Sequence, residues 1–355
     1  MKRDIIFLYQ SLADYIYSSM IVFVQSFPKF TLHIVNYPIN KYAPFHFKEV
    51  KGIYLYDRTK YDYNSLIKLC EQINPSAILV SGFSDKTYLR VAFQFKSLAT
   101  TKVFLLDNYW KGTLRQYIGL LFYRFIIKRI FSKVWVPGIR QYSYANLMGF
   151  DHSDISLGLY AANTDHFLDS YKHSYYTKVE SYPKVLLFVG RLVKYKWVVE
   201  LISCFIELDD EGLTNDWELL IVGEGPLNEI LPTSSKITYK EFLQPHILAE
   251  TTKSCGAFCL PSDCENFGVV VQEFTAAGLP IICSDSVGAH TDYVINNYNG
   301  FVFKTKDRRD FKEKLKELFY LDNSELLKMG TRSSILSTRY TKEQWVQHLS
   351  NYAKS

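Results

Sequence analysis

Two glutamates in the stretch 259–285 have the spacing to bind a phosphorylated sugar. Glu265 lies in a polar loop after an apolar run, and Glu273 lies eight positions later in an apolar segment that predicts a helix over 269–277. The first N–H groups of a helix are unpaired and lie at the positive end of its dipole, which suits a phosphate. Glu273, about two turns after Glu265, could accept hydrogen bonds from sugar hydroxyls.

The alternative interpretation of this pair is one acid on a surface loop and one on a solvated helix face. The residues around Glu273 are almost all apolar or small. A carboxylate in such a setting is costly unless it has a partner or a ligand. The surroundings of Glu273 therefore favour a binding role.

A cationic pair follows a second apolar run, which predicts a strand over 185–190. Arg191 comes directly after Gly190, and Lys196 comes five residues after Arg191. Ligands of open α/β sheets bind beyond the carboxyl ends of strands, where an arginine and a lysine can neutralise a diphosphate. Basic residues at strand ends are common, so the pair indicates a binding site only in combination with the glutamates of the same half.

The elements that must position these residues alternate between strand and helix in both halves, which predicts two parallel sheets covered by helices. With 355 residues, two domains of ordinary size are expected. We predict a first domain over 1–165, a polar, tyrosine-rich linker over 166–184, a second domain over 185–340, and a terminal helix over 341–355 with Thr341 as its N-cap.

The charge is distributed unevenly between the halves. Residues 1–160 carry 20 Lys and Arg against 10 Asp and Glu, which leaves 21 against 26 for the remainder. The basic half suits an anionic partner, such as a membrane surface, a phosphorylated acceptor or nucleic acid, although a merely soluble basic face would look the same. We find no nucleic-acid-binding motif, and therefore expect no nucleic acid as a partner.

The six cysteines form no CxxC pair and no Cys/His cluster with zinc-site spacing, so we expect buried thiols in a reducing cytosol and no metal site. No apolar span reaches ~20 residues, so no transmembrane helix is expected. The segment 114–131 predicts a helix that combines aromatic and basic residues. It fits either contact with an anionic membrane or a packed helix with snorkelling ends, because its charges lie on two roughly opposite sides.

Three motifs follow one another in the second half of the chain: VGRLVKYK at 189–196, LLIVGEGPL at 219–227, and LPSDCENFGVVVQEFTAAGLPIICSD at 260–285. Together they resemble the retaining glycosyltransferases of family four, of the bacterial polysaccharide type. The resemblance is clear over about 185–305 and extends to GLYAANTDHF at 158–167. It implies the GT-B fold, with two Rossmann-like, doubly wound domains facing each other across a cleft and a C-terminal helix that crosses back to the first domain.

The resemblance also implies roles for the residues above. Arg191 and Lys196 would hold the donor's diphosphate, and Glu265 would contact the sugar hydroxyls near the anomeric centre. Front-face attack would transfer the sugar with retention, without a metal, because cations and the helix dipole stabilise the leaving group. Asn266, Phe267 and Gly268 would present backbone N–H groups to sugar and phosphate, and Val269 would also contact the donor. Glu273 would bind the ribose, and the base would lie near Phe242 and Leu243.

Three departures from the family pattern concern the acceptor side and the pocket edge. The segment after the first strand, YQSLADYIYSSM, lacks the family's glycine-rich loop. Asp107 and Asn108 stand where many members carry a histidine, and Asp107 either orients a substrate or merely begins a turn. Trp197 replaces the glycine that usually follows the lysine.

The sequence therefore predicts a cytoplasmic hexosyltransferase, working at the inner face of the plasma membrane in surface polysaccharide synthesis. Its donor would be a nucleotide-diphosphate sugar, with UDP or GDP left open, and its acceptor a glycan, possibly lipid-linked. No separate cofactor is expected. Two alternatives remain: a catalytically silent GT-B partner of another transferase, and a nucleotide-sugar epimerase.

Overall fold

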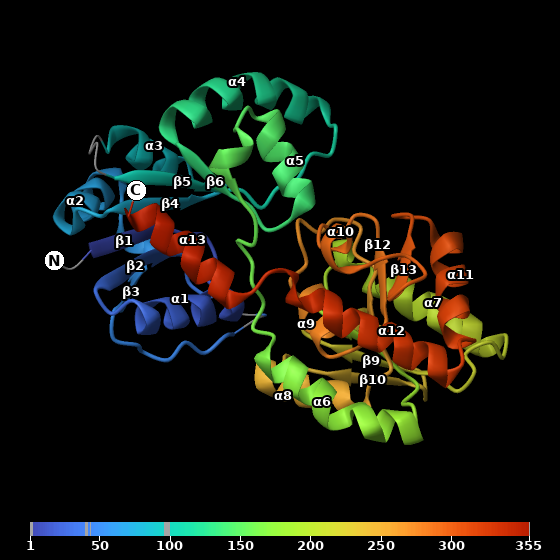
Figure 1. Ribbon diagram of the computed structural model, residues 1–355. Coiled ribbons are helices and arrows are strands. Elements are labelled where there is room, and N and C mark those ends of the chain that lie inside the picture. Colours follow the sequence, from blue (N-terminus) through green and yellow to red (C-terminus); the bar gives the residue numbers. More distant parts are fainter. Residues whose placement is uncertain (1–2, 40–41, 43, 96–99, 355) are drawn as a thin grey trace. The chain divides into compact units, whose positions relative to one another are not determined.

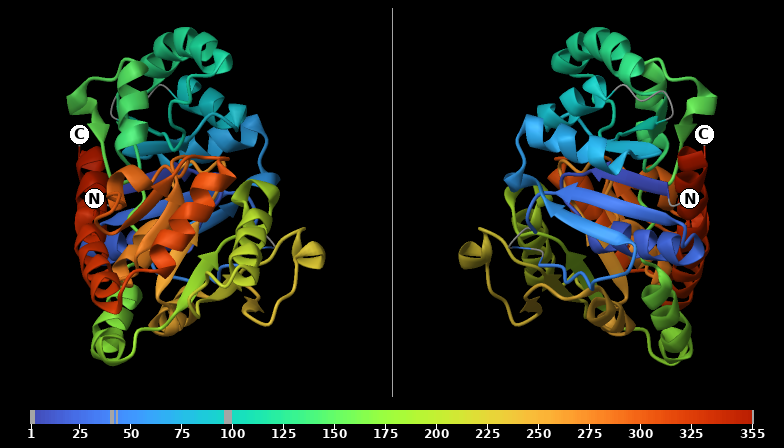
Figure 2. Two further views of the ribbon diagram at one scale, coloured as in Figure 1. Left: turned by 90° about the vertical axis from the view of Figure 1, so that its right-hand side faces the viewer. Right: turned by 90° about the vertical axis from the view of Figure 1, so that its left-hand side faces the viewer.

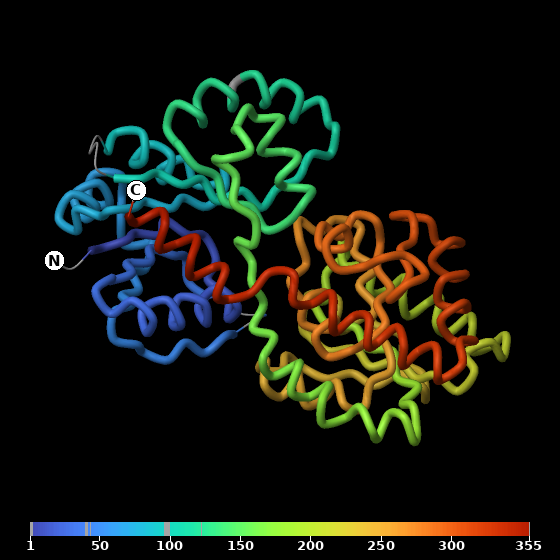
Figure 3. The backbone as a smooth tube through the Cα atoms, in the orientation of Figure 1, coloured from blue at the N-terminus to red at the C-terminus, as the bar shows by residue number. Residues whose placement is uncertain are grey.

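The computed structural model describes residues 3–39, 42, 44–95 and 100–354, with the side chain of Phe122 excepted. The chain forms two α/β units (Figure 1). Unit 1 comprises Met1–Asn40, Phe45–Ala161 and Tyr340–Ser355, and unit 2 is formed mainly by Ala162–Arg339. The last segment returns to unit 1 (Figure 3), which confirms the prediction that the C-terminal helix crosses back.

Unit 1 is built on a parallel seven-stranded sheet of order β3-β2-β1-β4-β5-β6-β7. Its strands are β1 (Arg3–Leu8), β2 (Phe30–Asn36), β3 (Ile53–Asp57), β4 (Ala77–Ser81), β5 (Thr101–Leu105), β6 (Lys133–Trp135) and β7 (Ile155–Ser156). Its helices are α1 (Asp14–Ser26), α2 (Tyr63–Ile73), α3 (Lys86–Gln94), α4 (Leu114–Ile130), α5 (Ile139–Leu147) and α13 (Lys342–Lys354).

Both faces of this sheet are covered by helices, as Figures 1 and 2 show. Alternate residues of a strand point to opposite faces. Ile5 and Phe7 of β1 accordingly join a core with α1 and α13. Ile6 and Leu8 join a second core with α2, α3, α4 and α5. A sheet buried on both faces explains why its strands are near-continuous apolar runs in the sequence.

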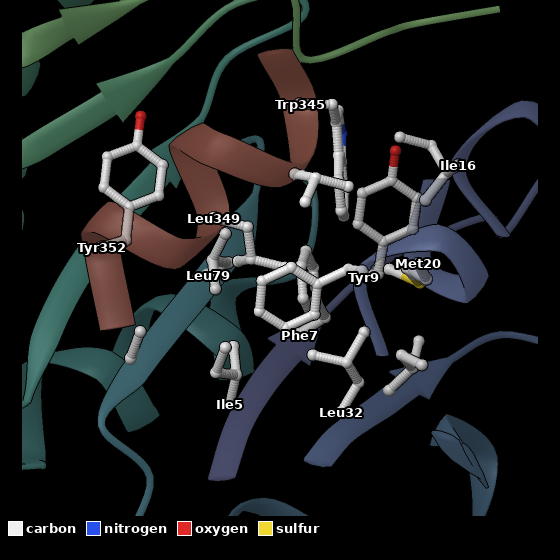
Figure 4. Close-up of a cluster of buried hydrophobic side chains, with 14 of the residues drawn as sticks. Ile5, Phe7, Tyr9, Ile16, Met20, Leu32, Leu79, Trp345, Leu349 and Tyr352 are labelled. Atoms are coloured by element: carbon white, nitrogen blue, oxygen red, sulfur yellow. The ribbon is translucent and has the colours of Figure 1, made fainter. Parts of the chain in front are cut away.

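Helix α13 packs on the first of these cores through Trp345 (Figure 4). The indole is 1% exposed, and its Nε1 donates to the carbonyl oxygen of Leu159 over 3.0 Å. It stacks on Phe7 with ring centroids 6.4 Å apart and packs against Trp135 at 5.1 Å. Thr341 caps the helix, with its hydroxyl accepting from the backbone N–H of Gln344 as predicted.

Unit 2 is built on a parallel six-stranded sheet of order β10-β9-β8-β11-β12-β13. Its strands are β8 (Val185–Val189), β9 (Glu218–Val222), β10 (Ile237–Lys240), β11 (Ala257–Leu260), β12 (Ile281–Ser284) and β13 (Gly300–Phe303). Its helices are α6 (Asp165–Glu180), α7 (Val198–Asp210), α8 (Pro245–Thr251), α9 (Val270–Ala276), α10 (His290–Tyr293), α11 (Arg308–Phe319) and α12 (Asn323–Leu336).

Helix α6 occupies the segment for which the sequence analysis predicted a linker over 166–184, and it belongs to unit 2. The residues that it buries are Phe167, Ser170, Ser174 and Lys178, which recur at helical spacing. Three of these four are polar, so the segment lacks the apolar stripe by which an amphipathic helix is usually detected. Hydrogen bonds replace that stripe, since the Ser170 hydroxyl donates to the carbonyl oxygen of Ala249 over 2.7 Å.

The buried ammonium of Lys178 predicts a measurable dependence of stability on pH. It donates to the carbonyl oxygens of Thr252 and Cys255 over 3.2 and 2.8 Å. Burial lowers the pKa of Lys178 to about 8. The unfolded chain therefore binds more protons than the folded one between pH 8 and the ordinary pKa of 10.5, so the free energy of unfolding should rise with pH in this window, by up to about 3 kcal/mol.

This contribution can be isolated by comparing the protein with Lys178→Met, which lacks the titrating group. Denaturant unfolding at a series of pH values should show the wild type gaining stability relative to the variant as the pH rises from 8 to 10.5. A constant difference between the two proteins across that window would contradict the assigned burial of the charge.

A glycine also occupies an interior position of a helix in unit 2, since α12 continues past Gly330 to Leu336. A Cβ at Gly330 would collide with the carbonyl oxygen of Gly278. Gly330 is therefore an interior position at which α12 crosses the turn after α9 at close range. Helix α5 was not predicted at all, and it too lacks a regular apolar stripe.

Candidate active site

The order of strands in unit 2 brings two of the predicted loops together. From the adjacent central strands β8 and β11, the chain proceeds outward to β9 and β10 on one side and to β12 and β13 on the other. The loops at the carboxyl ends of β8 and β11 therefore meet at the point where the winding direction changes. Open α/β sheets bind their ligands at such switch points.

The loop after β8 is held in place by the loop after β9. The backbone N–H of Leu192 donates to the carbonyl oxygen of Glu224 over 2.9 Å. A Cβ at Gly223 would collide with the carbonyl oxygen of Gly190, and one at Gly225 would collide with that of Leu192. Both glycines are therefore required for this close approach, which fixes the backbone around Arg191.

The predicted cations and one predicted acid lie together at the switch point. Lys196 forms an ion pair with Glu265, and the two side chains are only 12% and 20% exposed. The exposed guanidinium of Arg191 donates to the hydroxyl of Tyr195. The carbonyl oxygen of Tyr195 in turn accepts from the backbone N–H of Asp263 over 2.8 Å. Tyr195 thus ties the β8 loop, with its cations, to the β11 loop that carries Glu265.

Glu265 is fixed from the side of β12 as well. It forms a bridge with Val287, and its carbonyl oxygen accepts from the N–H of Gly288 over 3.1 Å. Gly268 has a φ of 90°, and a Cβ there would lie 3.1 Å from both Glu265 Cγ and Val287 Cγ1. Left-handed backbone and crowding both call for glycine at this position. Gly268 therefore lets the chain turn directly behind the Glu265 side chain.

The other predicted donor contacts lie on the same loop and its helix. Phe267 is 2% exposed, which leaves its backbone for contact with a ligand. That contact stays a prediction. The carbonyl oxygen of Phe267 already accepts from the N–H of Ala289 over 2.7 Å. Asn266 and Val269 flank it at half-buried positions, and Glu273 is half-buried in α9, which at Val270–Ala276 is a residue shorter at each end than predicted.

Phe242 and Leu243 follow β10, which lies at the edge of the sheet, two strands from β8. Strands are spaced by about 4.8 Å, so this loop begins about 10 Å across the same carboxyl edge from Arg191. Among the described residues, no three His, Cys, Asp or Glu side chains form a cluster suited to a metal ion.

Asp107 lies in unit 1, beyond the carboxyl end of β5. Burial of the phenols raises the pKa values of Tyr9 and Tyr160, and the charge of Asp107 adds to this effect. The side-chain amide of Gln141 donates to the backbone carbonyl oxygen of Asp107 over 3.2 Å. Asp107 therefore belongs to a tyrosine-lined cluster of unit 1, and its role toward a substrate stays a prediction.

Trp197 stands in a backbone conformation that favours glycine. Its φ is 58°, in the left-handed region, and it forms the N-cap of α7. The indole compensates by packing on Phe303 and Phe311, with ring centroids 6.3 and 6.1 Å away. The resemblance leads one to expect a glycine here. Trp197 instead adopts a strained backbone conformation, and the contacts of its indole with two aromatic rings offset that strain.

This arrangement predicts an unusual order of stability for two variants. Trp197→Ala should lower the free energy of unfolding by about 1–3 kcal/mol, because the ring contacts are lost while the strain remains. Trp197→Gly should be about 1 kcal/mol more stable than Trp197→Ala, since glycine adopts the left-handed region without strain. Thermal unfolding of both variants measures the difference, and an alanine variant as stable as the glycine one would contradict it.

Three residues that shape the site were missed from the sequence. Tyr195 was taken only as part of the VGRLVKYK motif, although it joins the two loops. Gly223 and Gly225 were taken only as part of the LLIVGEGPL motif. The glycine-x-glycine spacing directly after a buried strand was the available signal, because it marks a place where backbones approach closely.

A comparison with known families bears on the class of this site. Residues 177–333, which contain Arg191, Lys196 and Glu265, match the model of a family described as glycosyl transferases group 1. The match covers less than half of the chain, and this segment is similar to the group 1 glycosyltransferases. The motifs that carried the resemblance in the sequence lie on the strand-end loops of the matched segment.

Individual proteins are similar to this chain over the same region. An uncharacterized glycosyltransferase of Methanocaldococcus jannaschii is 29% identical over 167 residues, which are 45% of either chain. A GDP-mannose-dependent alpha-mannosyltransferase of Corynebacterium glutamicum is 33% identical over 136 residues, 37% of this chain and 30% of that protein. The N,N'-diacetylbacillosaminyl-diphospho-undecaprenol alpha-1,3-N-acetylgalactosaminyltransferase of Campylobacter jejuni is 28% identical over 137 residues, 37% of this chain and 34% of that protein.

The matched segments thus span less than half the length of each of these relatives. Similarity in fold covers the entire chain. The sucrose-phosphate synthase of Thermosynechococcus elongatus aligns with a TM-score of 0.74 over 99% of this chain and 98% of that chain, at 13% sequence identity. With two parallel, Rossmann-like sheets, the fold of this protein is GT-B.

Proposed function

We propose that this protein is a retaining hexosyltransferase that moves a sugar from a nucleotide-diphosphate donor to a lipid-linked glycan in surface polysaccharide synthesis. The ion pair between Lys196 and Glu265 at the switch point of unit 2 is the observation that carries the proposal. It joins a cation and an acid from two separate loops. Burying such a pair costs desolvation free energy and seldom stabilises a fold, so a functional reason for keeping it is favoured.

The donor's diphosphate would lie against Arg191 and Lys196. An ammonium has three N–H donors, so Lys196 can bind a phosphate oxygen while still contacting Glu265. The guanidinium of Arg191 is exposed and can bind a phosphate through two parallel N–H groups. Glu265, held by Gly268 and the β12 loop, would accept hydrogen bonds from the sugar hydroxyls.

In the reaction, the bond between the anomeric carbon and the diphosphate oxygen breaks, and the acceptor hydroxyl forms the new bond on the same face. The departing phosphate oxygen takes the proton of that hydroxyl. Arg191 and Lys196 stabilise the negative charge that develops on the leaving diphosphate, which is the kind of electrostatic help that contributes most in enzymes. This step requires no metal, which is a prediction that activity in the presence of EDTA tests directly.

The names of two relatives support the choice of substrates. One is named for a GDP-mannose donor, and one for an acceptor that is a diphospho-undecaprenol sugar. We therefore propose UDP or GDP as the carrier nucleotide and an isoprenoid diphosphate sugar as the acceptor. Transfer of a sugar to such an acceptor would take place at the inner face of the plasma membrane.

A donor screen tests the proposal. The full chain is incubated with UDP- and GDP-sugars and a lipid-diphosphate sugar acceptor, and the products are identified by mass spectrometry, with the anomeric configuration read by NMR. We expect one donor to yield a product that keeps the donor's configuration. Thermal stabilisation by a nucleoside diphosphate should accompany it.

The same screen separates the alternatives. A nucleotide sugar that is epimerised without transfer would identify an epimerase. Nucleotide binding without any turnover on the acceptors would favour a silent partner of another transferase. No stabilisation by any nucleoside diphosphate would contradict all three possibilities together.

A further inference from the structure

Helix α4 of unit 1 is apolar on two opposite sides. Its inner side packs on the sheet: Ile127 is 1% exposed, and Leu120, Tyr123 and Ile130 are partly buried against the same core. No other element of unit 1 covers its outer side in Figures 1 and 2. The outer side should therefore be polar if it faced only water.

The outer side instead carries a continuous apolar strip, which we call the α4 strip. Its members are Leu114 (76% exposed), Tyr117 (57%), Ile118 (53%), Leu121 (69%) and Phe125 (74%). At about 3.6 residues per turn, these five residues fall within roughly a third of the helix circumference. Contiguous exposed apolar surface of this kind marks an interaction site more often than scattered apolar residues do.

Basic side chains border the α4 strip along both edges. Arg124 lies along one edge, and Arg115 and Arg129 lie along the other, all three exposed. Lys128, beyond the end of the strip, forms an ion pair with Asp151. The helix contains no acidic residue. Within the part of the chain that the structure describes, Arg115 and Arg129 form no ion pair. The opposed charges that looked irregular in the sequence are thus the two borders of one apolar surface.

A pocket of about 770 Å³ opens beside the strip, between α2, α3 and α4. Phe93 and Phe125, which are 55% and 74% exposed, contribute apolar walls. Arg90 and Arg129 contribute two guanidinium groups. An apolar pocket with two cations at its lining is complementary to an anionic headgroup joined to an aliphatic chain.

We propose that the outer side of α4 docks on an anionic lipid bilayer, with the α4 strip in the boundary between headgroups and acyl chains. The bordering arginines bind lipid phosphates, and the pocket takes a headgroup with the first part of its chain. This surface deepens the proposed function, whose lipid-linked acceptor would lie in that bilayer. Binding itself requires no sugar donor, so its failure and the failure of sugar transfer are distinguishable.

The charges select a bilayer over a protein partner. An apolar strip with cations on both borders and no acid on its helix is the composition of a helix lying in the plane of an anionic interface. The 17 residues of α4 span about 26 Å, which is less than a membrane-crossing helix requires. None of the described helices is long and apolar enough to cross a bilayer.

Vesicle flotation with the full chain tests the proposal. We compare vesicles of phosphatidylcholine alone with an equimolar mixture of phosphatidylcholine and phosphatidylglycerol. The wild type should float with the anionic vesicles. Leu121→Ser with Phe125→Ser should weaken this binding by about a hundredfold, at about tenfold for each exposed side chain removed. Arg115→Gln with Arg129→Gln should abolish the preference for phosphatidylglycerol.

A matched control removes two exposed apolar side chains from unit 2. Tyr320→Ser with Ile335→Ser alters residues that are 55% and 65% exposed and should leave flotation unchanged. Unfolding midpoints equal to that of the wild type establish that each variant is folded. If the Leu121 and Phe125 pair fails this check, Leu114→Ser with Ile118→Ser replaces it.

Three results would overturn the proposal. The wild type could fail to float with anionic vesicles, or the strip variants could float as well as the wild type. The third result is self-association without flotation. The wild type would self-associate in sedimentation without vesicles, and the strip variants would not. The α4 strip would then bind a second copy of the chain.

Discussion

Lys196→Ala should lower kcat by about a hundred- to a thousandfold, which is the usual loss when a group that stabilises developing charge is removed. The ammonium is a partly buried cation of the candidate site and is paired with Glu265. Its loss would leave the leaving diphosphate with Arg191 alone. Initial rates with the donor found in the screen measure the effect, and binding of the free nucleoside diphosphate should weaken in parallel.

Two further variants separate this role from a structural one. Lys194→Ala removes an exposed lysine of the same loop and should retain full activity. Lys196→Met with Glu265→Gln removes both charges, so it should regain the stability that the single variant loses by leaving a half-buried carboxylate unpaired. It should remain inactive. Activity that returns with stability would show that the pair only supports the fold.

Trp345→Ala should destabilise unit 1 by about 3–5 kcal/mol, the range for removing a buried tryptophan. The indole is 1% exposed and fills the space between Phe7 and Trp135. Unfolding of a two-unit chain is not a single transition, so the effect is best followed by hydrogen exchange of peptides from each unit. Amides of β1 and β2 should lose protection, while those of β8 and β9 should not.

Glu343→Ala serves as the control for this experiment, because it alters an exposed residue of the same helix and should leave the exchange of β1 unchanged. Equal loss of protection in both units after Trp345→Ala would contradict the assignment of α13 to unit 1. Unchanged exchange of β1 would contradict the burial of the indole.

Strand positions were predictable wherever burial on both sides made an apolar run. The strand predicted over 185–190 is observed as β8 at Val185–Val189. Helix α6 was not predicted, because Ser170, Ser174 and Lys178 satisfy its buried face with hydrogen bonds rather than apolar contact. The role of Gly330 in α12 could not be predicted either, because a glycine needed for close packing is indistinguishable in sequence from one that ends a helix.

The candidate site was predictable in its residue types but not in its connections. Arg191, Lys196 and Glu265 could be singled out because each follows a buried strand, and parallel strands end at one edge. The sequence could not show that Lys196 contacts Glu265, since their strands lie far apart in the chain. It also could not show that Trp197 adopts a left-handed conformation, because that depends on its packing against Phe303 and Phe311.

A crystal structure of the protein with a bound nucleoside diphosphate tests the central claim most directly. The account predicts both phosphates at the carboxyl ends of β8 and β11, with the Arg191 guanidinium and the Lys196 ammonium in direct contact with their oxygens and Glu265 beside the terminal phosphate. A diphosphate bound elsewhere in unit 2, with Arg191 and Lys196 turned away from it, would contradict the account.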